Sequence, residues 1–217
     1  MPKSTPQTKR PLRTRGRPNS AELAKLESVI LKLALDEFLR HGYGGASLTN
    51  IVKSAGISKT TLYSRYASKA ELFTAIVQQQ IDALAPESVL PSEINTSSLE
   101  DGLIAYADHM LKRSLRPEIM GINRLMQSES ARFPELGEAA SNRTHRGIKR
   151  IADYIRKCAV NDNMPCKNPE SVAEVFIYMI RGWYINTMMT NNIPGPAARK
   201  RWIKQSIHVL LSSREAW

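Results

Sequence analysis

The stretch SLTNIVKSAGISKTTLYSRYASK, residues 47–69, decides the fold of this chain. Its apolar residues recur at helical spacing and are expected to face inward: Leu48, Ile51, Val52, Ile57 and Leu62. Gly56 interrupts the pattern, so the stretch predicts two short helices, 47–54 and 58–66, with a turn between them. This arrangement is typical of a helix-turn-helix, whose second helix enters the major groove of DNA.

The second of these helices carries short polar, aromatic and basic side chains on its outer face: Lys59, Thr60, Thr61, Tyr63, Ser64 and Arg65. Such side chains suit phosphate oxygens and base edges. A surface helix needs polar residues in any case, which would explain Lys59 and Arg65. It would not explain a run of Ser and Thr, which are mediocre helix formers. We therefore expect base choice to depend on Thr60, Thr61 and Arg65.

Longer helices flank this pair and complete the first domain, 20–85. The apolar residues of 20–41 lie on one helical face, and Ser68 with Glu71 forms a capping box that opens the following helix. A helix as short as 58–66 is marginal by itself in water. Its neighbours are therefore expected to hold it, as in a three-helix DNA-binding domain.

The charge of the chain favours double-stranded DNA as a partner. The 217 residues carry a net charge of +11. Residues 1–84 contain 13 Lys or Arg and six Asp or Glu, a balance of +7, against +4 for the remainder, with 18 and 14. A basic balance indicates nucleic acid or an acidic membrane surface. No apolar run approaches the ~18–20 residues that cross a bilayer. We expect a cytoplasmic protein without a membrane partner.

Residues 1–19 contain six basic residues and no acid, and their composition predicts a disordered arm. Within the arm, Arg15 and Arg17 flank Gly16 and precede Pro18, so both guanidinium groups could lie along a minor groove. Two interpretations stay open. The arm either reads the minor groove beside a major-groove helix, or adds only non-specific attraction to phosphates.

The second domain, 86–217, is predicted to be helical throughout. After a polar, Pro-containing loop at 86–98, the periodicity predicts five helices: 98–115, 117–129, 134–160, 169–191 and 196–213. The fold class is therefore all-α, with about nine helices. Because 169–191 is apolar on all sides, one subunit cannot easily cover it. We expect 169–191 and 196–213 to pair with their copies in a homodimer.

The first domain also resembles the DNA-binding domain of the TetR family of bacterial transcriptional regulators. The resemblance covers about 20–73 and is carried by Ser47-Leu48, Ile51, Ala55-Gly56-Ile57-Ser58-Lys59, Thr61-Leu62-Tyr63, Tyr66, Ser68-Lys69 and Glu71-Leu72-Phe73. It implies an all-helical homodimer that binds a palindromic operator and releases it when a small ligand enters the C-terminal domain.

The resemblance also implies roles for single residues. It places base reading on 59–65 and phosphate contacts on Ser47, Tyr63, Tyr66 and Lys69. We add Thr49 to this face. The predicted DNA-binding residues are Arg15, Arg17, Ser47, Thr49, Lys59, Thr60, Thr61, Tyr63, Arg65, Tyr66 and Lys69.

A pocket for the ligand is expected among the helices between 98 and 191. Small-molecule pockets are mostly apolar, and methionines adapt to ligand shape. The predicted lining residues are Tyr106, Met110, Met126, Phe133, Tyr154, Phe176, Met179 and Trp183. Any one of them could instead be ordinary core packing. This composition favours a small hydrophobic effector.

Features of other protein classes are missing from the sequence. The four histidines are dispersed and do not have the spacing of metal ligands. The sequence also contains no glycine-rich phosphate loop. We therefore expect no metal, no cofactor and no enzyme activity. Cys158 and Cys166 are expected to be free thiols. The leading hypothesis is a homodimeric repressor that a small molecule releases from a palindromic operator. The alternative is an architectural DNA-binding protein that senses no ligand, and an enzyme working in the C-terminal cavity ranks third.

Overall fold

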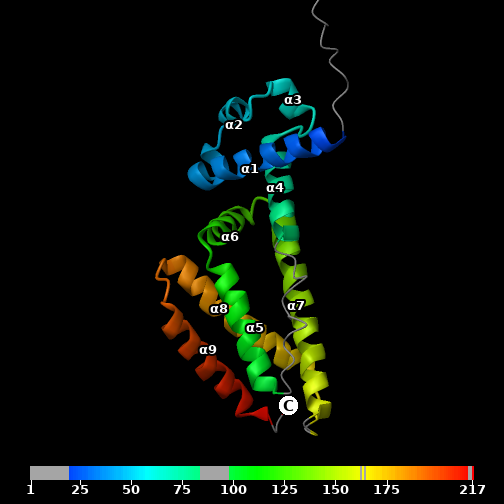
Figure 1. Ribbon diagram of the computed structural model, residues 1–217, viewed down its shortest axis with the longest axis vertical. Coiled ribbons are helices and arrows are strands. Elements are labelled where there is room, and N and C mark those ends of the chain that lie inside the picture. The colour runs from blue at the N-terminus through cyan, green and yellow to red at the C-terminus, as the bar shows by residue number, and fades with distance from the viewer. Residues whose placement is uncertain (1–19, 84–97, 162, 164, 215–216) are drawn as a thin grey trace, which may run out of the picture.

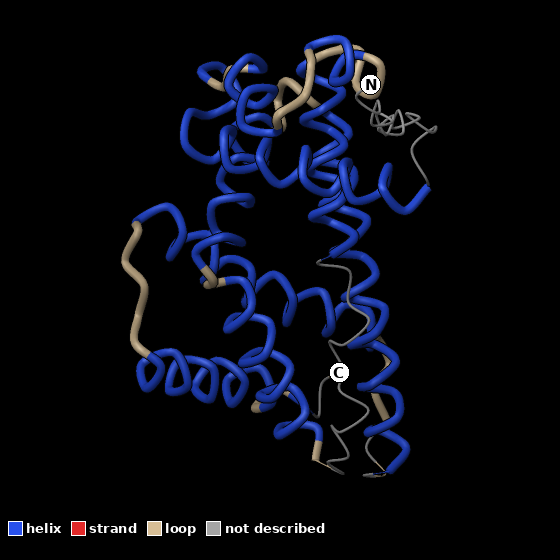
Figure 2. Tube along the Cα trace, turned by 45° about the horizontal axis from the view of Figure 1, so that its top comes forward, coloured by secondary structure: helices blue, strands red, loops and turns tan. Residues whose placement is uncertain are grey.

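The computed structural model describes residues 20–83, 98–161, 163, 165–214 and 217. Over these residues the chain forms nine α-helices and no strand (Figure 1, Figure 2). The helices are α1 (Ser20–Gly45), α2 (Leu48–Ala55), α3 (Lys59–Tyr63), α4 (Lys69–Ala83), α5 (Leu99–Ser114), α6 (Pro117–Glu129), α7 (Pro134–Asn161), α8 (Pro169–Thr190) and α9 (Pro196–Leu211). The all-α prediction is confirmed, and the bounds of α5 to α9 agree with the predicted ones within two residues.

Some predicted segments cannot be compared with the structure. The basic arm 1–19, with Arg15 and Arg17, and the loop 86–98 up to residue 97 lie outside the described residues. Among the helices of the described residues, none is long and apolar enough to cross a membrane.

The turn between α2 and α3 lies where the sequence predicts it. The Ser47 hydroxyl caps α2 by accepting the N–H of Asn50 at 3.4 Å. Gly56 ends α2 with φ 63° and ψ 30°, and its N–H donates to the carbonyl of Lys53 at 3.3 Å. This left-handed conformation is readily available only to glycine, so Gly56 sets the angle at which α3 leaves α2.

Helix α3 is shorter than predicted, because it ends at Tyr63 and not at Tyr66. The N–H groups of Arg65 and Tyr66 both donate to the Leu62 carbonyl, at 3.1 and 3.0 Å. That shared acceptor tightens the last turn, and the α-helical ladder does not continue.

Helix α1 differs in the opposite direction. The sequence predicts an end at His41, but a further helical turn follows a kink at Gly42, where φ is 66° and ψ is 174°. The kink turns the Tyr43 ring inward, where it stacks on Phe38 with 5.8 Å between ring centroids. Burial of this ring stabilises a bend that periodicity alone does not reveal.

The buried side chains form two clusters. The first, which we call the head core, is built on α1 to α4: Ile30, Leu31, Ala34, Phe38, Tyr43, Ala46, Ile51, Val52, Leu62, Tyr66, Leu72, Phe73, Ile76 and Val77. It also takes in five residues of the second half of the chain: Ile122, Leu125, Met126, Phe133 and Leu136. The division between the cores therefore does not coincide with the boundary predicted at residue 85.

The second cluster, the body core, joins α5, α7, α8 and α9, with Leu103, Ile151 and Phe176 completely buried. The free thiol of Cys158 lies in it, and Cys166 packs against it, so the prediction of free thiols is confirmed. In Figure 1, α1 to α3 form one end of the long axis, and α5, α8 and α9 the other. Helices α4 and α7 follow one another along the long axis, and α7 extends to the lower end beside α8.

Candidate functional site

The N-terminus of α2 is fixed to α1 by Glu37. Its Oε1 accepts the Ser47 N–H at 3.0 Å and the Asn50 side-chain N–H at 3.2 Å. The Ser47 hydrogen bond is the main cause that lowers the pKa of Glu37 below its ordinary value. Sequence analysis missed Glu37, because its partner lies ten residues away across a turn. Its carboxylate orients the first helix of the helix-turn-helix.

Helix α3 is anchored by the buried Leu62 and capped by Ser58, whose hydroxyl accepts the Thr61 N–H at 3.0 Å. The hydroxyls of Ser58 and Thr61 lie 2.8 Å apart, so the Thr61 side chain is engaged in the cap. Lys59, Thr60 and Tyr63 are exposed on the outer face. Of the residues predicted to read bases, Lys59, Thr60, Tyr63 and Ser64 are exposed, whereas Thr61 and Arg65 are partly buried.

The structure gives Tyr66 and Lys69 partners within the chain. Tyr66 is buried, and burial, followed by the neighbouring Glu27, raises its pKa to about 12. Its hydroxyl donates to Glu27 at 3.4 Å. The Lys69 Nζ donates to the carbonyls of Ala46 at 2.6 Å and Gly44 at 3.1 Å. Lys69 thus holds the turn between α1 and α2, and Tyr66 ties the end of α3 to the first half of α1. The contacts of both side chains with phosphate stay predictions.

The remaining residues predicted on this face differ in exposure. Thr49 is exposed, whereas Ser47 and Arg65 are partly buried. Exposed polar side chains thus occur on both α2 and α3, and the buried side of each helix packs in the head core.

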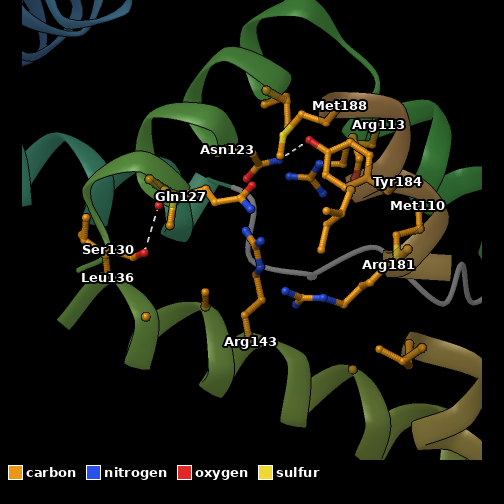
Figure 3. A pocket seen from close by; sticks show the side chains of 18 of the residues that line it. Met110, Arg113, Asn123, Gln127, Ser130, Leu136, Arg143, Arg181, Tyr184 and Met188 are labelled. Atoms are coloured by element: carbon orange, nitrogen blue, oxygen red, sulfur yellow. Dashed lines mark hydrogen bonds between the residues drawn. The ribbon is translucent and has the colours of Figure 1, made fainter. Parts of the chain in front are cut away.

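A cavity of about 390 Å³ lies between α5, α6, α7 and α8. Figure 3 shows several of its side chains. Its apolar wall is formed by Tyr106, Met110, Ile119, Met126, Leu136, Ile177, Ile185 and Met188. Its polar lining includes His109, Arg113, Asn123, Gln127, Arg143, Arg150, Arg181 and Tyr184.

Three of the predicted lining residues, Tyr106, Met110 and Met126, line this cavity. The other five lie elsewhere. Phe133 belongs to the head core, the Tyr154 hydroxyl donates to the Ser98 carbonyl, and Phe176 is fully buried in the body core.

Met179 and Trp183 point away from the cavity, and Trp183 stacks on Trp202 of α9 at 5.0 Å between ring centroids. Each of these two residues is two positions from a residue that lines the cavity, Ile177 and Arg181 respectively. Two positions turn a helix by about 200°, which explains the opposite direction.

Sequence analysis missed the arginines of the cavity. Four line it, Arg113, Arg143, Arg150 and Arg181, and its described lining includes no Asp or Glu. A signal was present in the sequence. Arg181 is the only Lys or Arg in 169–191, and Arg143 and Arg150 share a helical face with Gly147.

Helix α6 is held to α8 by polar contacts at the cavity wall. The side-chain amide of Asn123 donates to the Tyr184 hydroxyl at 2.6 Å. The Arg124 guanidinium donates to the carbonyl of Met188 at 2.8 Å and to the side chain of Asn191 at 2.9 Å. Arg124 thereby satisfies a carbonyl at the C-terminus of α8, where the helix has no partner of its own.

Two residues belong to both parts of the molecule. Met126 of α6 and Leu136 of α7 line the cavity and are also buried in the head core. The Phe133 ring, just before α7, packs on Tyr43 and Phe73 with centroid distances of 5.0 and 5.2 Å. Met126 and Leu136 therefore join the cavity wall directly to the packing beneath the helix-turn-helix. In the described part of the chain, no group of His, Cys, Asp or Glu could hold a metal ion.

A helix-turn-helix head on a helical body with an internal cavity defines the class of a DNA-binding regulator with a sensing domain. Comparison with known proteins supports this class. Residues 30–76 match the profile described as bacterial regulatory proteins, tetR family. Residues 101–213 match that of the AefR-like transcriptional repressor, C-terminal domain. The chain belongs to the TetR family of transcriptional regulators, with an AefR-like C-terminal domain.

Individual relatives support the same assignment. The HTH-type transcriptional repressor ComR of Escherichia coli is 30% identical over 94 residues, and the regulator RutR of the same species is 40% identical over 76. These matches cover 43% and 35% of this chain, and the same shares of ComR and RutR. A crystal structure of a TetR-family regulator from Mesorhizobium loti has a TM-score of 0.74 at 24% identity, covering 87% of this chain and 96% of that one.

Proposed function

We propose that this regulator represses transcription as a homodimer, which binds a palindromic DNA operator and leaves it when a small molecule enters the cavity. The observation that carries the proposal is the double role of Met126 and Leu136, which line the cavity and pack in the head core. In the proposal, each subunit inserts α3 into one half-site. The exposed Lys59, Thr60 and Tyr63 face the groove and its phosphates.

The exposed faces of α8 and α9 support the homodimer. Val175, Tyr178 and Met189 recur along one face of α8, with 57%, 50% and 71% of each residue exposed. Val209 of α9 is 70% exposed. Large apolar side chains gathered on adjacent helices mark an interaction surface. A two-fold axis would place each patch against its copy in a four-helix interface.

The proposed release is a population shift between two dimer geometries. Half-sites on one face of DNA recur about every 34–36 Å, so both α3 helices bind together only at a matching separation. A ligand that fits the cavity better in the other geometry favours that geometry by its difference in affinity. Movement of α6 and α7 would then tilt the head through Met126 and Leu136.

The test is a gel-shift titration with a palindrome found by footprinting upstream of the neighbouring gene. Thr60→Ala with Lys59→Ala should weaken binding at least tenfold at moderate salt, because a lost base contact is worth about 1–3 kcal/mol. Lys149→Ala, an exposed residue of α7 outside both the helix-turn-helix and the proposed interface, is the control and should bind normally. Absence of any sequence preference would sink the proposal. The architectural alternative would be favoured if DNA binding depends steeply on salt, and if deletion of 1–19 abolishes binding while the substitutions in α3 do not.

A further inference from the structure

The charge inside the cavity is not what a purely hydrophobic ligand requires. Four arginines and His109 line it, and two of these arginines, Arg143 and Arg181, have no carboxylate partner among the described residues. Positive groups gathered in a partly desolvated space repel one another, and the repulsion is stronger there than in water. A cavity built only for apolar contacts would not need this arrangement.

Arg143 shows this most clearly. It extends from α7 into the cavity toward Gln127 and Asn123 (Figure 3). Among the described residues it has no hydrogen-bond or ion-pair partner. Burial, followed by the charge of Arg181, lowers the pKa of Arg143 below its ordinary value. The folded protein thus holds a guanidinium in surroundings that disfavour its charge.

Arg181 approaches the same space from α8. Its guanidinium donates to the Thr144 hydroxyl, which in turn donates to the Ala140 carbonyl at 2.9 Å. Thr144 is buried, so this chain of hydrogen bonds fixes the direction of Arg181 toward Arg143. Figure 3 shows the two side chains approaching each other, Arg143 from below and Arg181 from the right. Arginine pairs of this kind suit an oxyanion, since each guanidinium can donate two parallel hydrogen bonds.

The rest of the wall suits an apolar group. Five large apolar or aromatic side chains belong to the cavity lining: Tyr106, Met110, Met126, Ile177 and Met188. The volume of about 390 Å³ falls within the range of small-molecule sites, about 300–1,000 Å³.

From this arrangement we infer that the effector is an amphipathic organic anion, whose carboxylate or phosphate group is bound between Arg143 and Arg181 while its apolar body contacts the methionine-lined wall. The inference rests on the proposed function and names the chemistry of its ligand. It also gives the ligand a mechanical role. An anion that joins Arg143 of α7 to Arg181 of α8 pulls on α7, whose first turn lies in the head core.

The test measures binding of small compounds to the protein in the absence of DNA. Within each series, the compounds share an apolar body and differ only in their end group. Octyl, decyl and naphthyl compounds ending in a carboxylate, a phosphate, a primary amide or an ammonium group are compared by calorimetry and thermal unfolding. The proteins are the wild type, Arg143→Met, Arg181→Met and the control Lys149→Met, an exposed residue of α7 outside the cavity. At least one anionic probe should bind the wild type and the control, and more tightly than its amide. Arg143→Met should weaken it roughly 10- to 100-fold, while the amide is unaffected.

A second readout is the Tm of the protein without ligand. Arg143→Met should raise its Tm, because it removes an unpaired charge, whereas a structural role for Arg143 would lower it. The relative affinity of carboxylate and phosphate identifies the headgroup. The inference is wrong if amides or ammonium compounds bind as tightly as the anions, or if no anionic probe depends on Arg143.

Failure of this inference is distinguishable from failure of the proposed function. If anions bind through Arg143 but leave the operator complex intact, the ligand class stands and the release mechanism does not. If neutral compounds release the operator and anions do not, the release mechanism stands and the ligand class is wrong.

Discussion

Gly56 is the residue on which the helix-turn-helix turn depends. Its φ of 63° is readily accessible to glycine, and no neighbouring atom lies near the place of a Cβ. Gly56→Ala should therefore destabilise the protein by about 1–2 kcal/mol through backbone strain alone. Thermal unfolding measures the change.

The matched control is Gly44→Ala. Gly44 also has open space around it, but its backbone is not left-handed. It lies within α1, where Ala is favoured over Gly by about 0.5–1 kcal/mol. No loss of Tm is expected. Equal losses at both positions would contradict the assignment of strain to Gly56.

Among the elements, α5 and α9 are joined by one nearly buried ion pair. Arg199 Nη2 lies 3.3 Å from Asp108 Oδ1, and the side chain of Arg199 is only 9% exposed. Asp108→Ala leaves this guanidinium buried without its carboxylate. We expect the free energy of unfolding to fall by about 2–3 kcal/mol. This is less than the roughly 3–5 kcal/mol lost when a fully buried pair is broken, because Asp108 is partly exposed. Urea unfolding at neutral pH checks this.

Lys112 provides the control, since it pairs with the same carboxylate at 2.6 Å but is 57% exposed. Lys112→Ala should have an effect below about 1 kcal/mol. If it destabilises as much as Asp108→Ala, the buried pair is not the main contribution.

The pair also predicts a pH dependence. Burial raises the pKa of Asp108, but Lys112 and Arg199 lower it more, so it lies below the ordinary 3.8. The folded state therefore favours the ionised carboxylate. This stability is fully present above the ordinary pKa and is lost as the pH falls through the lowered one. Asp108→Asn should flatten the fall in stability below pH of about 4.

At the scale of the whole molecule, the exposed patch on α8 and α9 should determine the oligomeric state. Tyr178→Asp places a charge at the centre of the proposed interface, where it has no partner. The variant should sediment as a monomer and lose at least tenfold in operator affinity, because one α3 contacts only a half-site. Val160→Asp is the control, since Val160 is 81% exposed on α7, a helix that is not part of the proposed interface. A dimeric Tyr178→Asp would contradict the proposed interface.

In the proposed release mechanism, α7 links the cavity to the head that carries the helix-turn-helix. Helix α7 has Arg143 in the cavity and Leu136 in the head core. The aromatic contacts of Phe133 with Tyr43 and Phe73 add about 0.5–1.5 kcal/mol each beyond area burial. They make the joint between α7 and the head stiff.

The sequence by itself determined the helices, the turn at Gly56 and the family of the chain. These depend on interactions between near neighbours: periodicity, caps and the conformational range of single residues. The short polar side chains of α3 could be assigned to the outer face for the same reason. The ends of the helices were predicted less well. The extra turn of α1 after Gly42 depends on a buried ring, and the early end of α3 depends on a carbonyl shared by two N–H groups.

Only the tertiary structure decided which neighbour each helical face meets. Periodicity shows that Met179 and Ile177 lie on different faces of one helix, but not that the cavity is on the side of Ile177. The same limit hid Arg143 and Arg181, which meet across two helices although 38 positions apart, and it hid the use of α6 and α7 in the head core. Contacts between residues so distant in sequence follow from how whole helices pack, and no local pattern records that packing.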